Sequence, residues 1–190
     1  MRLAVLSPRR AATTLLLLAS LPGAALAAGM GGSSDSTTPP TTTETTSKCT
    51  GTQVWNPETE ACEDAKQGRL SPDQLMGAVR ELAYAGRLND AQGVLRAMPD
   101  QSDDLVLTYW GFTHRKLGHA ALAASFYDRA IARNPDNILA RSYMGQGFVA
   151  AGDTDAAIAQ WREIVARGGR DSWAEASLRE AIRSGITYSY

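Results

Sequence analysis

The chain contains four cysteine and histidine side chains, the types that metal sites, redox chemistry and acid–base catalysis use most often. Cys49 and Cys62 are the only cysteines of the 190-residue chain. Two thiols without a nearby histidine form an incomplete metal site, and their spacing is far wider than the C-x-x-C of a redox pair. A structural disulfide is the remaining role, and two cysteines allow a single internal pairing. The other two side chains are His114 and His119.

The two histidines give no catalytic arrangement. His114 falls near the end of a predicted helix, and His119 lies in the turn that follows. A histidine that acts as a general base needs a positioned partner, and no triad is legible around either residue. The chain also has no G-x-S-x-G, no G-x-x-x-x-G-K and no H-E-x-x-H. We interpret His119 as a capping or solvent-facing residue and His114 as a packed or partly exposed one, and we predict a protein that is not an enzyme and has no cofactor or metal site.

The start of the chain predicts export. Residues 1–27 have a basic beginning, a short leucine run and the small-residue pattern Ala25-Leu26-Ala27, which together are typical of a secretory signal peptide cleaved after Ala27. The leucine run is much shorter than the roughly 20 apolar residues that a membrane-spanning helix needs. We therefore expect a periplasmic or secreted protein with no stable membrane span after cleavage.

An oxidising destination favours a bond between Cys49 and Cys62. Between them, Gln53-Val54-Trp55 predicts a short strand and Asn56-Pro57-Glu58-Thr59 a turn, so a hairpin spanning 49–62 would bring the sulfurs together. The closed loop would contribute ~3 kcal/mol by restricting the unfolded chain. The order Cys, Gly, aromatic, Asn-Pro, Cys is also similar to peritrophin-like chitin-binding domains, which carry more cysteines, and this likeness implies a hairpin that binds glycans.

Composition describes the segment before the hairpin and the charge of the exported chain. From Gly31 to Lys48, 11 of 18 residues are Ser or Thr and none is a large apolar residue, so we expect residues 28–48 to form a disordered tether.

Loss of residues 1–27 removes three arginines and no acid, leaving 16 basic and 20 acidic side chains. This small acidic excess argues against nucleic acid as the main partner.

From Ser71 onward the apolar spacing predicts helices. Ser71-Pro72-Asp73-Gln74 combines an N-cap serine, a proline at the first helical position and a glutamine three residues after the cap. Apolar residues then recur at spacings of three and four until Gly86. The remaining predicted helices are Asn89 to Met98, Asp103 to Leu117, His119 to Arg133, Asn137 to Ala151, Asp153 to Arg167 and Asp171 to Ser184.

A 34-residue shift superimposes two stretches of the chain. It carries Gly111 onto Gly145, Gly118 onto Gly152 and Tyr127 onto Trp161, and a period of this length indicates stacked repeats. The pattern resembles the tetratricopeptide repeat through its small residues, its aromatic residues and Pro135. The resemblance covers residues 71–184 and implies an all-α solenoid of about three helix-turn-helix units plus a C-terminal capping helix, preceded by the disulfide-closed hairpin and followed by a tail at 185–190.

The same resemblance implies that the first helix of each pair lines a concave groove. The candidate groove residues, carried over position by position, are Arg80, Tyr84, Thr108, Tyr109, Phe112, Arg115, Lys116, Ser142, Tyr143, Gln146 and Val149. Spacings of four and three place Thr108, Phe112 and Arg115 on one helix face. Aromatic stripes more often complete a core, and this alternative stays open for Tyr109 and Tyr143.

Basic and aromatic side chains are interleaved on this predicted face, which also includes Arg141. Such a surface suits an extended segment with acidic and apolar side chains. The favoured function is therefore an exported, non-enzymatic scaffold that binds a protein or peptide in the groove. The alternative is an envelope-associated or glycan-binding protein that acts through the hairpin between Cys49 and Cys62. The pattern with which some family members clamp a terminal carboxylate is not reproduced, because Thr108, Phe112 and Ser142 stand at positions where charged or amide side chains are needed.

Overall fold

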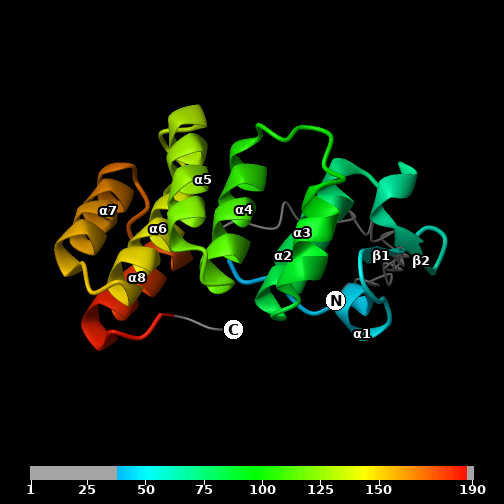
Figure 1. The fold of residues 1–190 in the computed structure, drawn as a ribbon, viewed down its shortest axis with the longest axis horizontal. Helices are drawn as coiled ribbons and strands as arrows, with labels where there is room; N and C mark the ends of the chain where they lie inside the picture. Colours follow the sequence, from blue (N-terminus) through cyan, green and yellow to red (C-terminus); the bar gives the residue numbers. More distant parts are fainter. Residues whose placement is uncertain (1–37, 188–190) are drawn as a thin grey trace, which may run out of the picture. The chain divides into compact units, whose positions relative to one another are not determined.

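A computed structural model of the chain describes residues 38–187 (Figure 1). The predicted signal peptide, its cleavage point and the first part of the predicted tether lie outside the described residues. The described part is mostly helical, with one two-stranded sheet. Its elements are α1 (Glu44–Ser47), β1 (Gln53–Asn56), β2 (Ala61–Asp64), the short 3-10 helix η1 (Ala65–Gln67), α2 (Pro72–Tyr84), α3 (Leu88–Leu95), α4 (Asp104–Lys116), α5 (Ala120–Arg133), α6 (Ile138–Ala150), α7 (Thr154–Ala166) and α8 (Trp173–Ser184).

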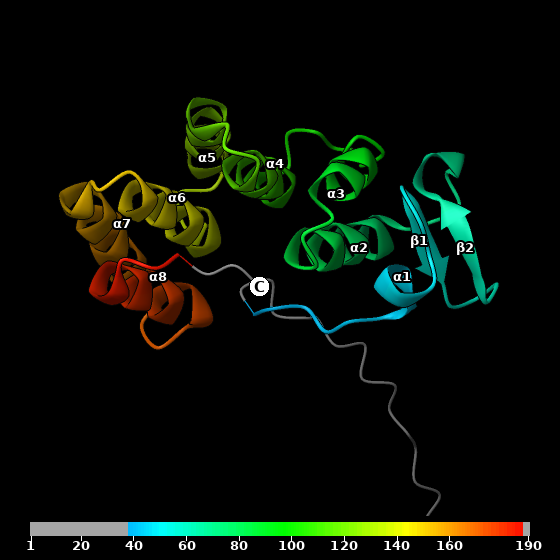
Figure 2. The ribbon, with the colours of Figure 1, turned by 60° about the horizontal axis from the view of Figure 1, so that its bottom comes forward.

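Six of these helices form three consecutive pairs, α2/α3, α4/α5 and α6/α7 (Figure 2). The turns within the pairs contain Gly86, Gly118 and Gly152, and all three have positive φ angles of 76° to 84°. A side chain is strained in that backbone region, which explains why glycine ends each first helix. The first helices α2, α4 and α6 also pack on one another, and α8 packs on α6 and α7. The helical character predicted from the apolar spacing is confirmed.

Two helix ends differ from the sequence prediction. The predicted second helix continued to Met98, but α3 ends at Leu95, where the chain tightens into turns closed by Ala97 N to Val94 O and Met98 N to Leu95 O. The last helix begins at Trp173 rather than Asp171, because the Ser172 hydroxyl accepts the backbone N–H of Glu175 and caps the helix there. Side-chain caps thus set boundaries that periodicity alone left open.

Glycines permit the closest helix contacts. A Cβ atom built on Gly111 of α4 would lie 2.5 Å from Cε1 of Tyr127 on α5, so the two helices approach as the sequence predicted. The matching Gly145 of α6 faces Leu178 of α8 instead, at 2.6 Å from its Cδ2. Trp161, the counterpart of Tyr127, donates from Nε1 to Glu175 at 2.7 Å. Corresponding residues of the two sequence repeats therefore make different contacts in the two helix pairs.

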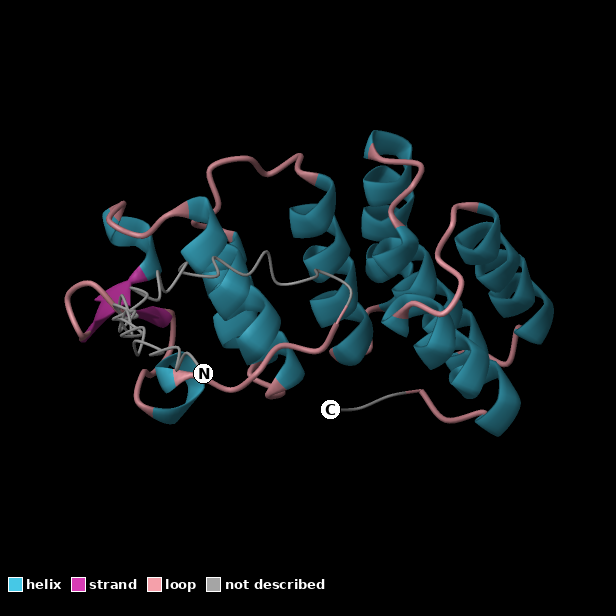
Figure 3. Ribbon diagram, turned by 180° about the vertical axis from the view of Figure 1, so that it is seen from behind, coloured by secondary structure: helices cyan, strands magenta, loops and turns pink. Residues whose placement is uncertain are grey.

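The disulfide prediction is confirmed: Cys49 and Cys62 are bonded, with their Cα atoms 5.6 Å apart. The two strands form the small magenta sheet of Figure 3. Strands β1 and β2 are antiparallel, and Trp55 pairs with Cys62 in their register. The hairpin packs on the first helix pair rather than standing apart, because Val54 is buried in the same core as α2 and α3 and Thr52 lies against Gly93. The hairpin therefore covers apolar side chains of α2 and α3.

The structure corrects the expectation of a disordered tether for residues 38–48. This segment runs over α2 and forms α1, whose start is held by the buried carboxylate of Glu81. Glu81 accepts the N–H groups of Thr43 and Thr46 at 2.7 and 3.1 Å, and both of their hydroxyls at 2.6 Å. Arg87 donates to Cys49 O at 3.0 Å beyond the other end of α1. Hydrogen bonds to buried charged groups order a segment that has little apolar surface.

Candidate functional site

The predicted groove aromatics come together in one cluster, which we call the inner aromatic cluster. It contains Tyr84 of α2, Tyr109 and Phe112 of α4, Tyr143 of α6 and Trp173 of α8. The ring of Phe112 lies 5.6 Å from that of Tyr84 and 4.7 Å from that of Tyr143, and the Tyr84 and Tyr143 hydroxyls are 2.5 Å apart. The ring of Trp173 lies 6.2 Å from those of Tyr84 and Tyr143. The first helices therefore share this face, as predicted.

The inner aromatic cluster is a packed layer. Tyr109, Phe112 and Tyr143 are 1% exposed or less, and Tyr84 is 8% exposed. Burial raises the pKa of Tyr143 well above its usual value, and the neighbouring Tyr109 and Tyr84 act in the same direction. Burial also raises the pKa of Tyr109, while the positive charge of Arg80 opposes the shift. The phenols are therefore neutral groups that stiffen the helix packing, which supports the core interpretation of these aromatics.

Three polar residues predicted to line the groove form hydrogen bonds between helices instead. Thr108 accepts a hydrogen bond from Asn137 Nδ2 at 3.0 Å, which ties α4 to the start of α6. Ser142 shares a hydrogen bond with Ser177 of α8 at 3.1 Å, and Gln146 donates to the same hydroxyl at 3.5 Å. All three candidates are 1% exposed or less. This corrects the expectation that they face a partner, because their polar atoms are used where first helices meet.

The basic candidates are also engaged within the chain. Arg80 is 4% exposed and donates to Thr38 O at 2.6 Å. Arg141 donates to Pro135 O at 3.0 Å. Arg115 and Lys116 lie over the ring of Phe112, at 5.6 and 5.9 Å from its centroid. The prediction of an acidic partner across the groove thus loses much of its basis, because Arg80 and Arg141 donate within the chain and only Arg115 and Lys116 remain as candidates for such a contact.

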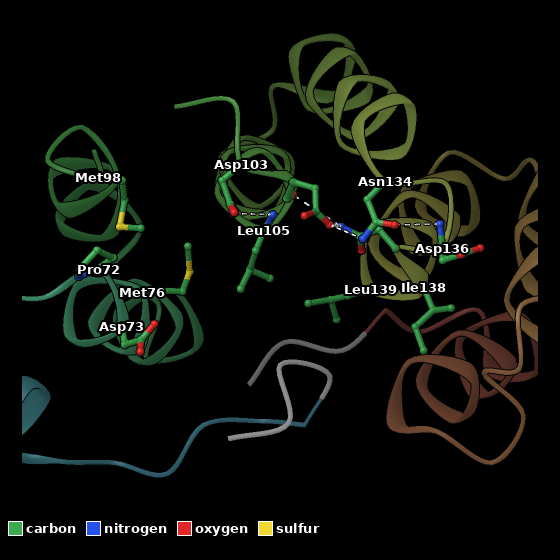
Figure 4. A pocket seen from close by; sticks show the side chains of 12 residues that line it. Pro72, Asp73, Met76, Met98, Asp103, Leu105, Asn134, Asp136, Ile138 and Leu139 are labelled. Carbon is green, nitrogen blue, oxygen red and sulfur yellow. Dashed lines mark hydrogen bonds between the residues drawn. The ribbon is translucent and has the colours of Figure 1, made fainter. Parts of the chain in front are cut away.

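An open cavity lies where the first helices begin, and we call it the end cavity (Figure 4). Its volume is about 510 Å³, and side chains of α2, α4 and α6 line it together with Met98 and the loop before α6. Met76, Leu105 and Leu139 project toward its middle from three different helices (Figure 4). Each of these helices begins here because a side chain caps it: Ser71 for α2, Asp103 for α4 and Asn137 for α6.

Carboxylates give the end cavity its charge. Asp73, Asp103, Asp104 and Asp136 line it, and no basic side chain does among the described lining residues. Asp104 is fixed by the amide of Asn137 at 2.7 Å, while Asp73 is exposed on the first turn of α2. Apolar walls with an acidic rim attract apolar and cationic groups together. None of these residues was assigned a functional role from the sequence, although the recurrence of Asp and Asn at helix starts was the available signal.

The histidines contact each other, with Nδ1 of His114 3.3 Å from Nδ1 of His119. The His114 ring lies against both Trp110 and Phe126, at 5.7 and 5.5 Å, and these two rings are 5.8 Å from each other. Burial lowers the pKa of His114, and His119 and Arg96 add to this effect. His119 occupies the N-cap position of α5 without a side-chain hydrogen bond to the helix and is exposed, which agrees with its interpretation as a solvent-facing residue. Within residues 38–187, no three His, Cys, Asp or Glu side chains are grouped so that they could hold a metal ion.

The hairpin offers little free aromatic surface. Trp55 is its only aromatic residue, and the ammonium of Lys48 lies 4.6 Å from the centre of that ring. The buried side chain of Asn56 donates to Glu63 at 3.0 Å within the hairpin. Sugar-binding sites usually present an open aromatic face with polar groups around it, and this arrangement instead fits a cap on the first helix pair.

Two further observations complete the description of the chain. None of the helices found between residues 38 and 187 is long and apolar enough to cross a membrane. Comparison of the chain with protein-family models, with curated proteins and with solved structures found no match, so the resemblance to tetratricopeptide repeats rests on the residues and the helix pairs described above.

Proposed function

We propose that the protein is an exported scaffold of the tetratricopeptide-repeat type, without enzymatic activity, that binds an extended protein or peptide segment at the end cavity. The observation that carries this proposal is that side chains of three successive first helices line one open cavity. A surface formed by repeated units in this way suits a segment long enough to contact several units at once. The bond between Cys49 and Cys62 supports an oxidising location such as the periplasm or the extracellular space.

The lining defines the chemistry of the partner. Met76 and Met98 offer flexible, polarisable apolar contacts, and Leu105 and Leu139 add a firmer wall. The carboxylates on the rim favour basic side chains, which is the opposite of the acidic partner expected from sequence. The proposed partner segment therefore combines apolar residues with Lys or Arg.

The inner aromatic cluster would keep the cavity in shape. Its rings join α2, α4, α6 and α8 through stacked and edge contacts of 4.7 to 6.2 Å. The segment 38–43 adds a further contact on α2, since Arg80 donates to Thr38 O. A surface whose side chains are already ordered loses little entropy when a partner binds. The partner segment would thus find a preformed site.

Selection from a random peptide library tests the proposal. Peptides that bind the full chain should be enriched in Lys or Arg next to apolar residues. Asp73→Lys should weaken them by about tenfold at low salt and by less at high salt, because it reverses one charge on the rim. Asp155→Lys is the matched control: it places the same charge change on the first turn of α7, where Asp155 is also exposed. Equal binding to both variants would exclude the end cavity as the site.

A further inference from the structure

A second cavity lies at the opposite ends of the same helices. Its volume is about 420 Å³, and it is enclosed by the end of α4, the start of α5 and the second half of α6. The walls are apolar, with Ala121 and Ala124 on one side and Met144, Phe148 and Ala151 on the other. We call it the α5/α6 cavity. Among the described residues that line it there is no acid, and Arg115 is the only charged side chain.

Arg115 lies at this cavity with its charge unpaired. Its Nε and Nη2 atoms are buried and have no hydrogen-bond partner. Other half-buried arginines behave differently: Arg87 pairs with Asp90 at 2.8 Å, and Arg141 donates to a carbonyl at 3.0 Å. Buried guanidinium donors without acceptors destabilise a fold, so an arrangement of this kind calls for an acceptor from outside the chain.

A buried phenol stands beside the guanidinium. Tyr127 is 1% exposed and lines the same cavity, and its hydroxyl lies beside the Arg115 side chain without a well-formed hydrogen bond to it. Burial raises the pKa of Tyr127 to about 12, although the nearby charge of Arg115 acts in the other direction. The hydroxyl is therefore protonated at neutral pH and is available as a donor. Gly111 makes this position possible, because its missing side chain leaves room for the ring.

We propose that the α5/α6 cavity binds an aliphatic monocarboxylate, whose carboxylate accepts hydrogen bonds from Arg115 and Tyr127 and whose alkyl chain lies between α5 and α6. The two oxygens of a carboxylate match the forked donors of a guanidinium. A doubly charged phosphate would need more cationic or N–H donors than this cavity holds. The alanine, methionine and phenylalanine walls suit a flexible hydrocarbon chain, and the volume is in the range of small-molecule sites.

The site is separate from the one in the proposed function. The end cavity is lined by residues at the beginnings of the first helices, such as Leu105 and Leu139, whereas this cavity is lined by residues near their ends, such as Arg115 and Phe148. A variant at Arg115 therefore leaves the lining of the end cavity unchanged. The two proposals can fail independently.

Calorimetric titration of the full chain, with its disulfide intact, tests the proposal with octanoate as the probe and 1-octanol as the neutral comparison. Octanoate should bind more tightly than 1-octanol. Arg115→Met should weaken octanoate by about tenfold or more and leave 1-octanol unchanged, because it keeps the apolar stem and removes the charge. The control is Arg162→Met, which removes the same charge from an exposed position on α7.

Two further measurements keep the test decisive. Tyr127→Phe retains the ring that packs under Gly111 and should weaken octanoate by a few fold through loss of one donor. Without ligand, Arg115→Met should unfold no more easily than the original protein, since it removes an unpaired charge, whereas a purely structural Arg115 would make this variant less stable. Octanoate binding that is absent in the original protein, or that is equal in Arg115→Met and Arg162→Met, would overturn the proposal.

Discussion

Replacing Gly111 by alanine probes the contact on which the second helix pair depends. The new Cβ would lie 2.5 Å from Cε1 and 2.6 Å from Cδ1 of Tyr127, roughly 1 Å closer than ordinary van der Waals contact. The ring is 1% exposed and rigid, so it cannot turn away as the tip of an aliphatic chain does. Overpacking of this kind costs about 1–3 kcal/mol, and the better helix propensity of alanine returns at most about 1 kcal/mol. We expect a net loss of about 1–2 kcal/mol in the free energy of unfolding.

Urea unfolding followed by circular dichroism measures this difference. The matched control is Gly77→Ala on α2, where a Cβ would have no atom within 4 Å and the propensity gain should stand alone. Gly77→Ala should therefore raise the unfolding midpoint and Gly111→Ala should lower it. In a Tyr127→Leu background, Gly111→Ala should cost little, because the obstructing ring is gone. If Gly111→Ala stabilised the original protein as much as Gly77→Ala does, the close approach of α4 and α5 would be refuted.

Two other predictions concern polar groups. Glu81→Gln should lower the free energy of unfolding by about 1–2 kcal/mol, because the amide keeps one acceptor and loses the charge. It should also speed amide hydrogen exchange at Thr43 and Thr46. Unchanged exchange at these two residues would contradict the docking of α1 on α2 through Glu81. The pKa of His114 is lowered below its usual value of 6.5, so the folded state binds fewer protons than the unfolded state. Stability should thus fall as the pH drops from about 7.5 through 6.5, and His114→Gln should flatten that decline; equal pH profiles would count against the buried, stacked position of this ring.

The helix pairs were predictable because their signals are local. Gly86, Gly118 and Gly152 each end a helix through their own backbone conformation, and the capping box at Ser71 forms as the sequence indicated. The disulfide followed from two cysteines on either side of a turn. None of these features depends on how distant parts of the chain meet.

The candidate groove was predicted less well, because helical spacing shows which residues share a face but does not show what covers that face. Ser142 and Gln146 were on a common face as expected, and Ser177 of α8 covers it. The order of residues 38–48 was missed for a related reason. The low apolar content was read correctly, but a composition argument does not include a buried carboxylate 35 or more residues away, such as Glu81, that binds Thr43 and Thr46.

The α5/α6 cavity could not be predicted from the sequence for a third reason. Its walls are ordinary helix residues, mainly alanines on α5 and a mixture of small and large apolar residues on α6, and no sequence pattern marks the space between them. The sequence placed Arg115 on the predicted groove face and gave no sign of a cavity beside it. Only the structure shows that its Cδ atom lies close to Gly147 of α6 and that Nε and Nη2 of the guanidinium are buried.

The docking of α1 has a mechanical consequence. A pull applied to the chain at Thr38 would load its bond to Arg80 first and then the bonds between Glu81 and the threonines at the start of α1. These bonds would break one after another, so the extension would be gradual and require little force. Beyond Cys49 the covalent link to Cys62 bears the load, and residues 49–62 cannot be drawn out. The segment 38–48 would thus lengthen first, and the disulfide would pass the load on to the chain beyond Cys62 without extension of the loop between the two cysteines.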